Sequence, residues 1–276
     1  MGAIRRIVLC ADDYALAPGV SSAIRALISR GRLNAVSVMT VLPEFAVEAS
    51  ALAATSAPIR VSIGLHVTLT GQFQPLQANP LPTANGRFPM IAQYLAPTTW
   101  WRVSRGHVEA EVGAQIEAFR CAFGRPPDFV DGHQHVQLAP GVRAAFLRAV
   151  ARGAPGAWVR QCAPARLQSI FTGERKTMAL AWFSAGFGLQ ARLRGLATNP
   201  AFAGAYDYST GEDFGSLFAG FLVDLPDGGV VMCHPGFVDE ELCARDGLTD
   251  RREAEYTFLA GDGLPQALKR AGATLA

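Results

Sequence analysis

Short apolar, β-branched runs alternate along this chain with amphipathic stretches, and this alternation restricts the fold more than any other feature. The runs have the length of buried strands and lie at residues 7–10, 35–42, 61–65, 129–130 and 230–233. Apolar residues at helical spacing predict helices between them, at residues 20–30, 108–123 and 141–152. Apolar strands that alternate with helices are typical of a parallel sheet covered on both faces. The sequence therefore predicts an α/β fold built from parallel βα units.

Length and composition limit the organisation and the partners of the chain. Its 276 residues, half of them hydrophobic, suit one α/β barrel, so we expect a single domain over residues 1–276. A net charge of +2 does not indicate the positively charged surface that binds nucleic acid. No long apolar span or secretory leader is evident, and five cysteines without a CxxC pair indicate buried thiols in a reducing compartment. We therefore expect a cytoplasmic protein, while the oligomeric state is not specified.

The polar residues of most interest stand where the predicted strands end. They are Asp12 and Asp13 after the first run, His66 after the run at 61–65, Asp131, His133 and His135 after the run at 129–130, and His234 after the run at 230–233. The carboxyl ends of parallel strands form one face, where catalytic residues collect, so we expect these segments to meet. Four of the five histidines belong to this set, and only His107 lies elsewhere, in a charged stretch where we expect it to be exposed.

The adjacent carboxylates of Asp12 and Asp13 suggest metal chemistry. Two acids behind an apolar strand are costly to bury without a cation or hydrogen-bonding partners. One of them could hold an ion while its neighbour acts as a base. The alternative is that the pair begins a helix, where aspartate is favoured as a cap.

The segment Asp131-Gly-His-Gln-His-Val-Gln137 carries the strongest single signal. In a strand, residues two apart share a face, so Asp131, His133, His135 and Gln137 would point the same way. Imidazole suits first-row divalent metals, and a ligating histidine usually needs a carboxylate behind it. His66 and His234, taken singly, would each more often be a hydrogen-bonded structural histidine than a functional one.

Together these segments resemble the YdjC-like carbohydrate deacetylases. The family pattern appears as Ala11 to Tyr14, Gly64 to His66, Asp131 to His135 and Cys233 to Pro235, in the expected order over most of the chain. The resemblance implies a distorted (β/α) barrel related to polysaccharide deacetylases. It also implies one divalent metal ion, Mg²⁺ or Zn²⁺. The resemblance implies that Asp13, His66 and His133 bind this ion, that Asp12 is the general base and that His234 is the general acid. His135 would be a further ligand or would lie behind the ligands. Gln137 stands where many relatives carry a histidine.

The C-terminal half resembles a narrower branch, the hopanoid-biosynthesis-associated deacetylases. The matching segments are Asn199 to Tyr208, Cys233 to Asp239 and Leu248 to Tyr256. This resemblance implies an N-acetylglucosaminyl glycolipid, a hopanoid, as substrate. The uncharged stretch Met178 to Leu189, flanked by basic residues, fits peripheral contact with the inner face of a membrane, although a buried core helix is the alternative.

The expected reaction is metal-dependent hydrolysis of an N-acetyl group from an amino-sugar. Soluble chito-oligosaccharides are the alternative substrates. One alternative enzyme is a phosphoesterase, which would need ligands for a second metal ion. Another alternative is a non-enzymatic lipid or sugar carrier with a groove lined by Trp100, Trp101 and the 178–189 stretch. Such a carrier would need none of the acids and histidines. Arg160 would either orient Asp12 or form a surface salt bridge. Residues 75–99, rich in proline, alanine, asparagine and glycine, are expected to form a long surface loop.

Overall fold

The fold is built on a single curled parallel sheet. The computed structural model describes residues 3–57, 59–71, 73–165, 175–209 and 211–276. Within these residues the strands run in the order β5-β4-β3-β2-β1-β7-β6, and β8 pairs with β1 beyond this path. Every pairing is parallel. The strands are β1 (Arg5–Tyr14), β2 (Ala35–Val38), β3 (Ser62–Val67), β4 (Phe129–Gly132), β5 (Trp158–Val159), β6 (Phe202–Ala203), β7 (Val230–Cys233) and β8 (Ala273–Leu275).

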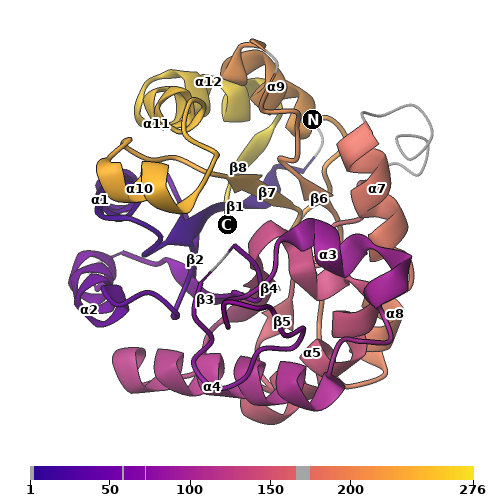
Figure 1. The fold of residues 1–276 in the computed structure, drawn as a ribbon. Helices are drawn as coiled ribbons and strands as arrows, with labels where there is room; N and C mark the ends of the chain where they lie inside the picture. The colour runs from indigo at the N-terminus through magenta and orange to yellow at the C-terminus, as the bar shows by residue number, and fades with distance from the viewer. Residues whose placement is uncertain (1–2, 58, 72, 166–174, 210) are drawn as a thin grey trace.

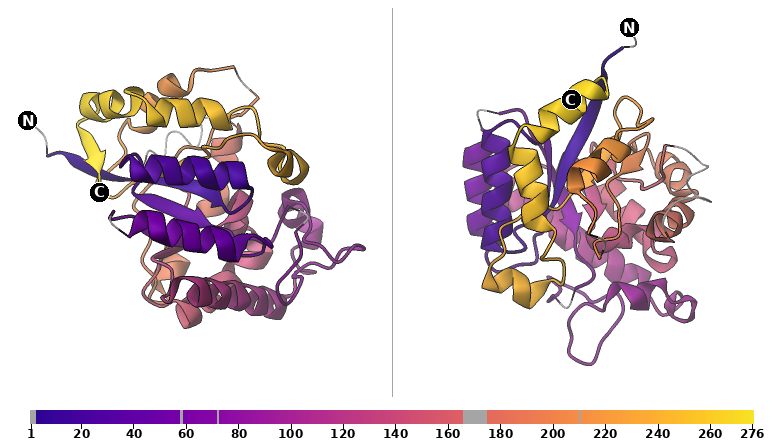
Figure 2. Two further views of the ribbon diagram at one scale, coloured as in Figure 1. Left: turned by 90° about the vertical axis from the view of Figure 1, so that its left-hand side faces the viewer. Right: turned by 90° about the horizontal axis from the view of Figure 1, so that it is seen from above.

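Helices surround the sheet on its outer side (Figure 1). They are α1 (Pro18–Ser29), α2 (Phe45–Ser56), α3 (Ile91–Leu95), α4 (Arg105–Phe123), α5 (Pro140–Gly153), α7 (Arg175–Ser184), α8 (Phe187–Arg192), α9 (Phe214–Phe221), α10 (Glu240–Arg245), α11 (Arg252–Ala260) and α12 (Gly263–Arg270), with 3₁₀ turns η1 (Pro97–Thr99) and η2 (His133–Leu138). Figure 2 shows α1 and α2 side by side against the sheet. This right-handed βα wrapping places one face of the sheet toward a central core.

The two ends of the sheet approach each other and nearly close a barrel. The amide of Val159 in β5 donates to the carbonyl of Ala197 at 2.9 Å, and the amide of Phe202 in β6 donates to Ala163 at 3.0 Å. The α/β fold and the distorted barrel predicted from the sequence are therefore confirmed. All five predicted strands and all three predicted helices are present, with shifts of a few residues at their ends.

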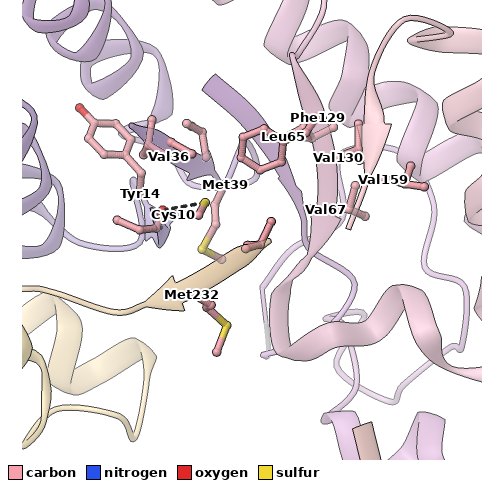
Figure 3. Packing of buried hydrophobic residues seen from close by; sticks show 14 of the residues in the cluster. Cys10, Tyr14, Val36, Met39, Leu65, Val67, Phe129, Val130, Val159 and Met232 are labelled. Carbon is pink, nitrogen blue, oxygen red and sulfur yellow. Dashed lines mark hydrogen bonds between the residues drawn. The ribbon is translucent and has the colours of Figure 1, made fainter. Parts of the chain in front are cut away.

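Close packing between strands fills the interior, as Figure 3 shows for residues from β1 to β7. The ring of Phe129 stacks on Trp158 at a centroid distance of 4.6 Å. The ring also lies against Gly64 in the neighbouring strand β3, where an added Cβ would lie 2.4 Å from it. Gly64 is thus the residue that admits this ring, and it brings His66 into register opposite Asp131.

Several expectations for individual segments need correction. The strand expected at 35–42 ends at Val38. The segment 75–99 is not loop throughout, because Ile91–Leu95 forms α3 and Pro97–Thr99 a 3₁₀ turn. The 178–189 stretch is divided between α7 and α8 at Gly186, whose φ of 74° ends one helix before the next begins.

The cysteine prediction is wrong for two of the five residues. Cys10, Cys162 and Cys233 are buried, whereas Cys121 and Cys243 are exposed, and all are free thiols. Cys121 and Cys243 lie in α4 and α10, where the outer faces of the helices meet solvent. Among the described residues, no helix is both long and apolar enough to cross a lipid bilayer.

Candidate metal centre and active site

A cavity of about 370 Å³ opens at the carboxyl ends of the strands, where the sequence predicted the polar segments to converge. Its polar lining comes from five strand ends or the segments that follow them and includes Asp12, Asp13, His66, His133, His135, Tyr208, His234 and Asp246. Its apolar lining includes Ile91, Leu95, Leu138, Leu180 and Phe183. Helix α3 and helix α7 thus contribute apolar walls to a site whose floor is charged.

A backbone irregularity at the end of β1 separates the two aspartates. The pairing of β1 with β2 shifts register between Ala11 and Tyr14, and Asp13 has a φ of 65°. A β-bulge re-aims side chains in this way, and a left-handed non-glycine residue is uncommon outside such functional positions. Neither aspartate caps α1, whose N-cap residue is Ala17, so the capping alternative is wrong.

Asp13, His66 and His133 form one buried cluster. Asp13 Oδ1 lies 3.2 Å from His66 Nε2 and 3.0 Å from His133 Nδ1. One potential ligand atom from each of the three residues lies within 4.8 Å of the other two. These are the residues that the resemblance to YdjC-like proteins assigned to a metal ion. One carboxylate and two imidazoles converging on a point are a donor set that suits Zn²⁺ and related divalent cations.

Asp131 completes the cluster from behind. Its Oδ1 lies 2.7 Å from His66 Nδ1 and also accepts a hydrogen bond from the Ser37 hydroxyl at 2.5 Å. A proton held on Nδ1 by this carboxylate leaves Nε2, which faces Asp13, as the ring atom that would bind a cation, the arrangement that a ligating histidine requires. The residues therefore fit a divalent cation. Burial alone would lower the pKa of His66, but Asp131 and Asp13 raise it to about 10.

The turn that carries His133 and His135 differs from the predicted strand. Strand β4 ends at Gly132, and Gln134 and His135 have φ values of 53° and 57° within η2. Consequently the histidines do not share one strand face. His135 is absent from the ligand cluster found among the described residues, and its Nδ1 lies 3.6 Å from the Cys162 thiol instead. Gln137 is fully buried, and its amide donates to the carbonyl of Arg160 at 3.3 Å.

Arg160 is fully buried, so the surface salt bridge considered from the sequence is wrong. Its guanidinium holds both oxygens of Asp12, at 2.5 and 2.7 Å, and reaches Asp131 Oδ2 at 2.6 Å. Burial would lower the pKa of Arg160, but the two carboxylates raise it well above its ordinary value. Asp12 is thereby paired and fixed in the cavity wall, with its carboxylate directed by a planar two-point contact.

His234 follows β7 directly and lines the same cavity as Asp12. Its Nδ1 shares a hydrogen bond of 3.2 Å with the Tyr208 hydroxyl, and its backbone amide donates to Glu255 at 2.6 Å. Glu255 also accepts from the hydroxyl of Tyr206 at 2.6 Å. Burial raises the pKa of Glu255 to about 7 despite these hydrogen bonds. The backbone of His234 is thus anchored by a buried acid from α11.

Sequence reasoning missed the contributions of α11 and the segment before it. Arg252 is fully buried, and its Nη2 donates to Asp13 Oδ2 at 2.8 Å and to Asp246 Oδ2 at 2.9 Å. In the sequence Arg252 and Glu255 stand in a charged run of the kind that normally forms a solvent-facing helix. The predicted site residues that the structure brings together are Asp12, Asp13, His66, Asp131, His133 and His234, all within or next to one cavity.

Fold and site define a class of protein: a single-sheet parallel α/β half-barrel with a buried carboxylate–histidine cluster at the carboxyl ends of its strands. Residues 6–270 match the family described as YdjC-like protein, and the chain belongs to that family.

Curated relatives and a solved structure resemble the chain over nearly its whole length. Chitooligosaccharide deacetylases of Yersinia pestis (strain Pestoides F) and Yersinia pseudotuberculosis serotype O:1b are each 26% identical over 281 residues, covering 96% of this chain and 95% of theirs. A crystal structure from Enterococcus faecalis V583, assigned provisionally to cellobiose-phosphate cleavage, is 21% identical. It covers 99% of this chain and 97% of its own with a TM-score of 0.76, a likeness of fold.

Proposed function

We propose that this protein is a metal-dependent deacetylase that hydrolyses the N-acetyl group of an amino-sugar. The observation that carries the proposal is the buried Asp13–His66–His133 cluster in a cavity that Asp12 and His234 also line. Membership of the YdjC-like family and the deacetylase relatives from Yersinia support the same reaction. The ion that the cluster would hold is a divalent cation, with Mg²⁺ and Zn²⁺ as the candidates.

The residues around the cluster supply the other elements of amide hydrolysis. A bound divalent cation supplies Lewis-acid polarisation of the acetyl carbonyl and of the attacking water. Asp12 is the general base that accepts the proton of the water. Arg160 keeps Asp12 in place through both carboxylate oxygens. His234 is the general acid that protonates the leaving amine, and Tyr208 orients its ring through Nδ1. The products are acetate and a free amino-sugar.

The guanidinium of Arg160 occupies the place where a phosphoesterase would need a second metal ion. Cys10, Asp12 and Asp131 form another group of close potential ligands. The guanidinium of Arg160 already contacts all three, at 3.0 Å to the thiol and 2.5 to 2.7 Å to the carboxylates. A cationic side chain at this point opposes a second metal ion nearby, which favours a centre with one metal. A carrier would not need such a costly buried set of charges.

The apolar walls of the cavity support a finer proposal, that the sugar bears an apolar group. Six isoleucine, leucine or phenylalanine side chains line the cavity, among them Leu180 and Phe183 from α7. Trp182 in the same helix is 75% exposed, and Leu193 just beyond α8 is 76% exposed. Apolar side chains in the cavity lining, together with exposed apolar side chains in α7 and just beyond α8, suit a glycolipid taken from a membrane surface. The names of the Yersinia relatives favour soluble chito-oligosaccharides as the second candidate.

Acetate release tests the proposal directly. The purified protein is treated with a chelator and assayed with an N-acetylglucosaminyl glycolipid and with N-acetylated chito-oligosaccharides, before and after single divalent cations are added back. We expect activity that disappears on chelation, returns with Mg²⁺ or Zn²⁺, and is greater on the glycolipid. Release from the soluble oligosaccharide alone would remove the glycolipid proposal. Activity that persists undiminished without any cation would contradict the metal-dependent mechanism itself.

A further inference from the structure

Arg252 is a buried cation that touches the proposed metal centre from outside. It lies at the start of α11, and its Nε donates to the carbonyl of Leu248 at 2.7 Å. Its Nη2 bridges two carboxylates, Asp13 Oδ2 at 2.8 Å and Asp246 Oδ2 at 2.9 Å. Gly236 leaves room for this side chain, because an added Cβ there would lie 3.2 Å from Arg252 Cδ. The hydrogen bonds to Leu248, Asp13 and Asp246, together with the close packing against Gly236, hold the guanidinium in one position.

The two oxygens of Asp13 consequently have separate partners. Oδ1 faces His66 Nε2 and His133 Nδ1, whereas Oδ2 is held by Arg252. We propose that Arg252 is a positioning residue that restricts Asp13 to binding the cation through a single oxygen and thereby sets which cation the centre prefers. This inference rests on the proposed function, because it requires that the Asp13–His66–His133 cluster binds a divalent metal.

The preference follows from how carboxylates bind cations of different size. Zn²⁺ favours four ligands in a tetrahedron and Mg²⁺ a strict octahedron, and both are satisfied by one oxygen from a carboxylate. Ca²⁺ takes more oxygens in a flexible geometry and accepts both oxygens of one carboxylate. A carboxylate whose second oxygen is held by a guanidinium cannot turn to chelate an ion. Loss of Arg252 would free Asp13 Oδ2 and favour the larger cation.

The ratio of the Zn²⁺ affinity to the Ca²⁺ affinity distinguishes the positioning of Asp13 by Arg252 from the electrostatic effect of the arginine charge. Removing a cationic side chain beside the site strengthens the attraction for every divalent ion, because the Coulomb energy depends on charge and distance. Two ions of equal charge gain by nearly the same amount, so their affinity ratio cancels most of this effect. The ratio of Zn²⁺ to Ca²⁺ affinity therefore reports coordination geometry.

The experiment measures binding of Zn²⁺ and of Ca²⁺ by calorimetry on the wild-type protein, on Arg252→Met and on Arg245→Met as the matched control. Arg245 is also an arginine near the cavity, but it pairs with Glu44 rather than with the cluster. We expect the Zn²⁺-to-Ca²⁺ affinity ratio to fall by about tenfold or more in Arg252→Met, the size of effect seen when groups behind a ligand are removed, and to stay unchanged in Arg245→Met. X-ray absorption of the Ca²⁺ form should show an added oxygen ligand in Arg252→Met alone.

Each result supports or contradicts a distinct statement. An unchanged ratio and an unchanged calcium coordination shell in folded Arg252→Met would overturn the role of Arg252. Wild-type protein that binds neither cation would instead contradict the metal centre of the proposed function. If Arg252→Met does not fold, Arg252→Lys is read in its place, because lysine keeps the buried charge but lacks the planar fork that contacts Leu248 and Asp13 together. Its ratio should fall in the same direction, and an unchanged ratio there also overturns the inference.

Discussion

The guanidinium of Arg160 holds both carboxylate oxygens of Asp12, across 148 positions of sequence and in complete burial. Arg160 follows β5 near one edge of the sheet, whereas Asp12 belongs to β1 in its middle. The curl of the sheet brings the two together (Figure 1). The same guanidinium reaches Asp131, so a single arginine links the proposed base to the carboxylate behind His66.

The first prediction concerns the stability that depends on Arg160. Arg160→Met leaves Asp12 and Asp131 buried without their cation, and breaking a buried ion pair in this way typically costs about 3–5 kcal/mol. We expect the free energy of unfolding, measured by urea titration, to fall by about that amount. Arg6→Met is the control, because the Arg6–Asp227 pair lies on the surface. Equal, small effects of the two substitutions would show that the buried network contributes little.

The second prediction assigns the general base. Asp12→Asn preserves the size of the side chain but cannot accept the proton of the attacking water. We expect kcat for acetate release to fall by about 10²–10⁴-fold, the usual contribution of general acid–base catalysis. Metal binding should persist, because Asp12 lies outside the Asp13–His66–His133 cluster. A variant that retains the wild-type rate would show that another group removes the proton.

The third prediction concerns the carboxylate behind His66. Asp131→Asn weakens the contact that fixes the His66 ring, while Asp13, His66 and His133 remain. We expect the affinity for the divalent cation to fall by about 10–100-fold, as it does when groups behind a metal ligand are replaced. Calorimetric titration measures it, with Ser37→Ala as a milder variant that removes the hydroxyl contacting Asp131 Oδ1 and His66 Nδ1 but keeps both carboxylate oxygens of Asp131. Unaltered affinity in Asp131→Asn would mean that His66 does not need this partner.

The fourth prediction links pH to stability through Glu255. Burial raises its pKa from 4.5 to about 7, so the folded protein binds the proton more tightly than the unfolded chain does. The stability contributed by this group is therefore fully present below pH 4.5 and is lost as the pH rises to about 7. The loss amounts to at most about 3 kcal/mol.

Melting curves between pH 4.5 and pH 8 test this dependence. Glu255→Gln cannot ionise, so the difference in stability between the variant and the wild type should shift in favour of the variant as the pH rises. Glu253→Gln, at an acid two positions away that contacts only the amide of Val238 at 3.3 Å, is the control. Parallel pH profiles for Glu255→Gln and the wild type would be inconsistent with a titrating Glu255.

The fifth prediction concerns the segment that covers one side of the cavity. Buried Glu111 in α4 accepts hydrogen bonds from the amides of Leu76, Gln77 and Ala78 at 2.8 to 3.0 Å. Glu111→Ala leaves these amides without their acceptor, so we expect a local opening of the segment that leads to α3. Limited proteolysis should cut between residues 79 and 90 faster than in the wild type, because local opening exposes the backbone. Glu117→Ala, on the exposed face of the same helix, should leave the cleavage rate unchanged.

Much of the site could be predicted because parallel strands align their carboxyl ends. Polar residues that directly follow apolar runs, such as Asp13, His66 and His234, needed only the strand assignment to be placed together. The prediction that His133 and His135 share one strand face was wrong because it extended β4 by strand periodicity. The left-handed residues Gln134 and His135 end the strand at once, and no property of their side chains indicates that conformation.

The sequence by itself determined which residue types stand at the strand ends, and therefore the α/β class, the candidate cluster and its neighbouring acid, since apolar periodicity and parallel pairing are local rules. Only the tertiary structure decided which cationic side chains neutralise the buried aspartates. Arg160 and Arg252 come from segments 148 and 239 positions away from their aspartates. A buried arginine has no periodic signature that distinguishes it from one in solvent, because its position depends on which distant carboxylate the curled sheet brings to it.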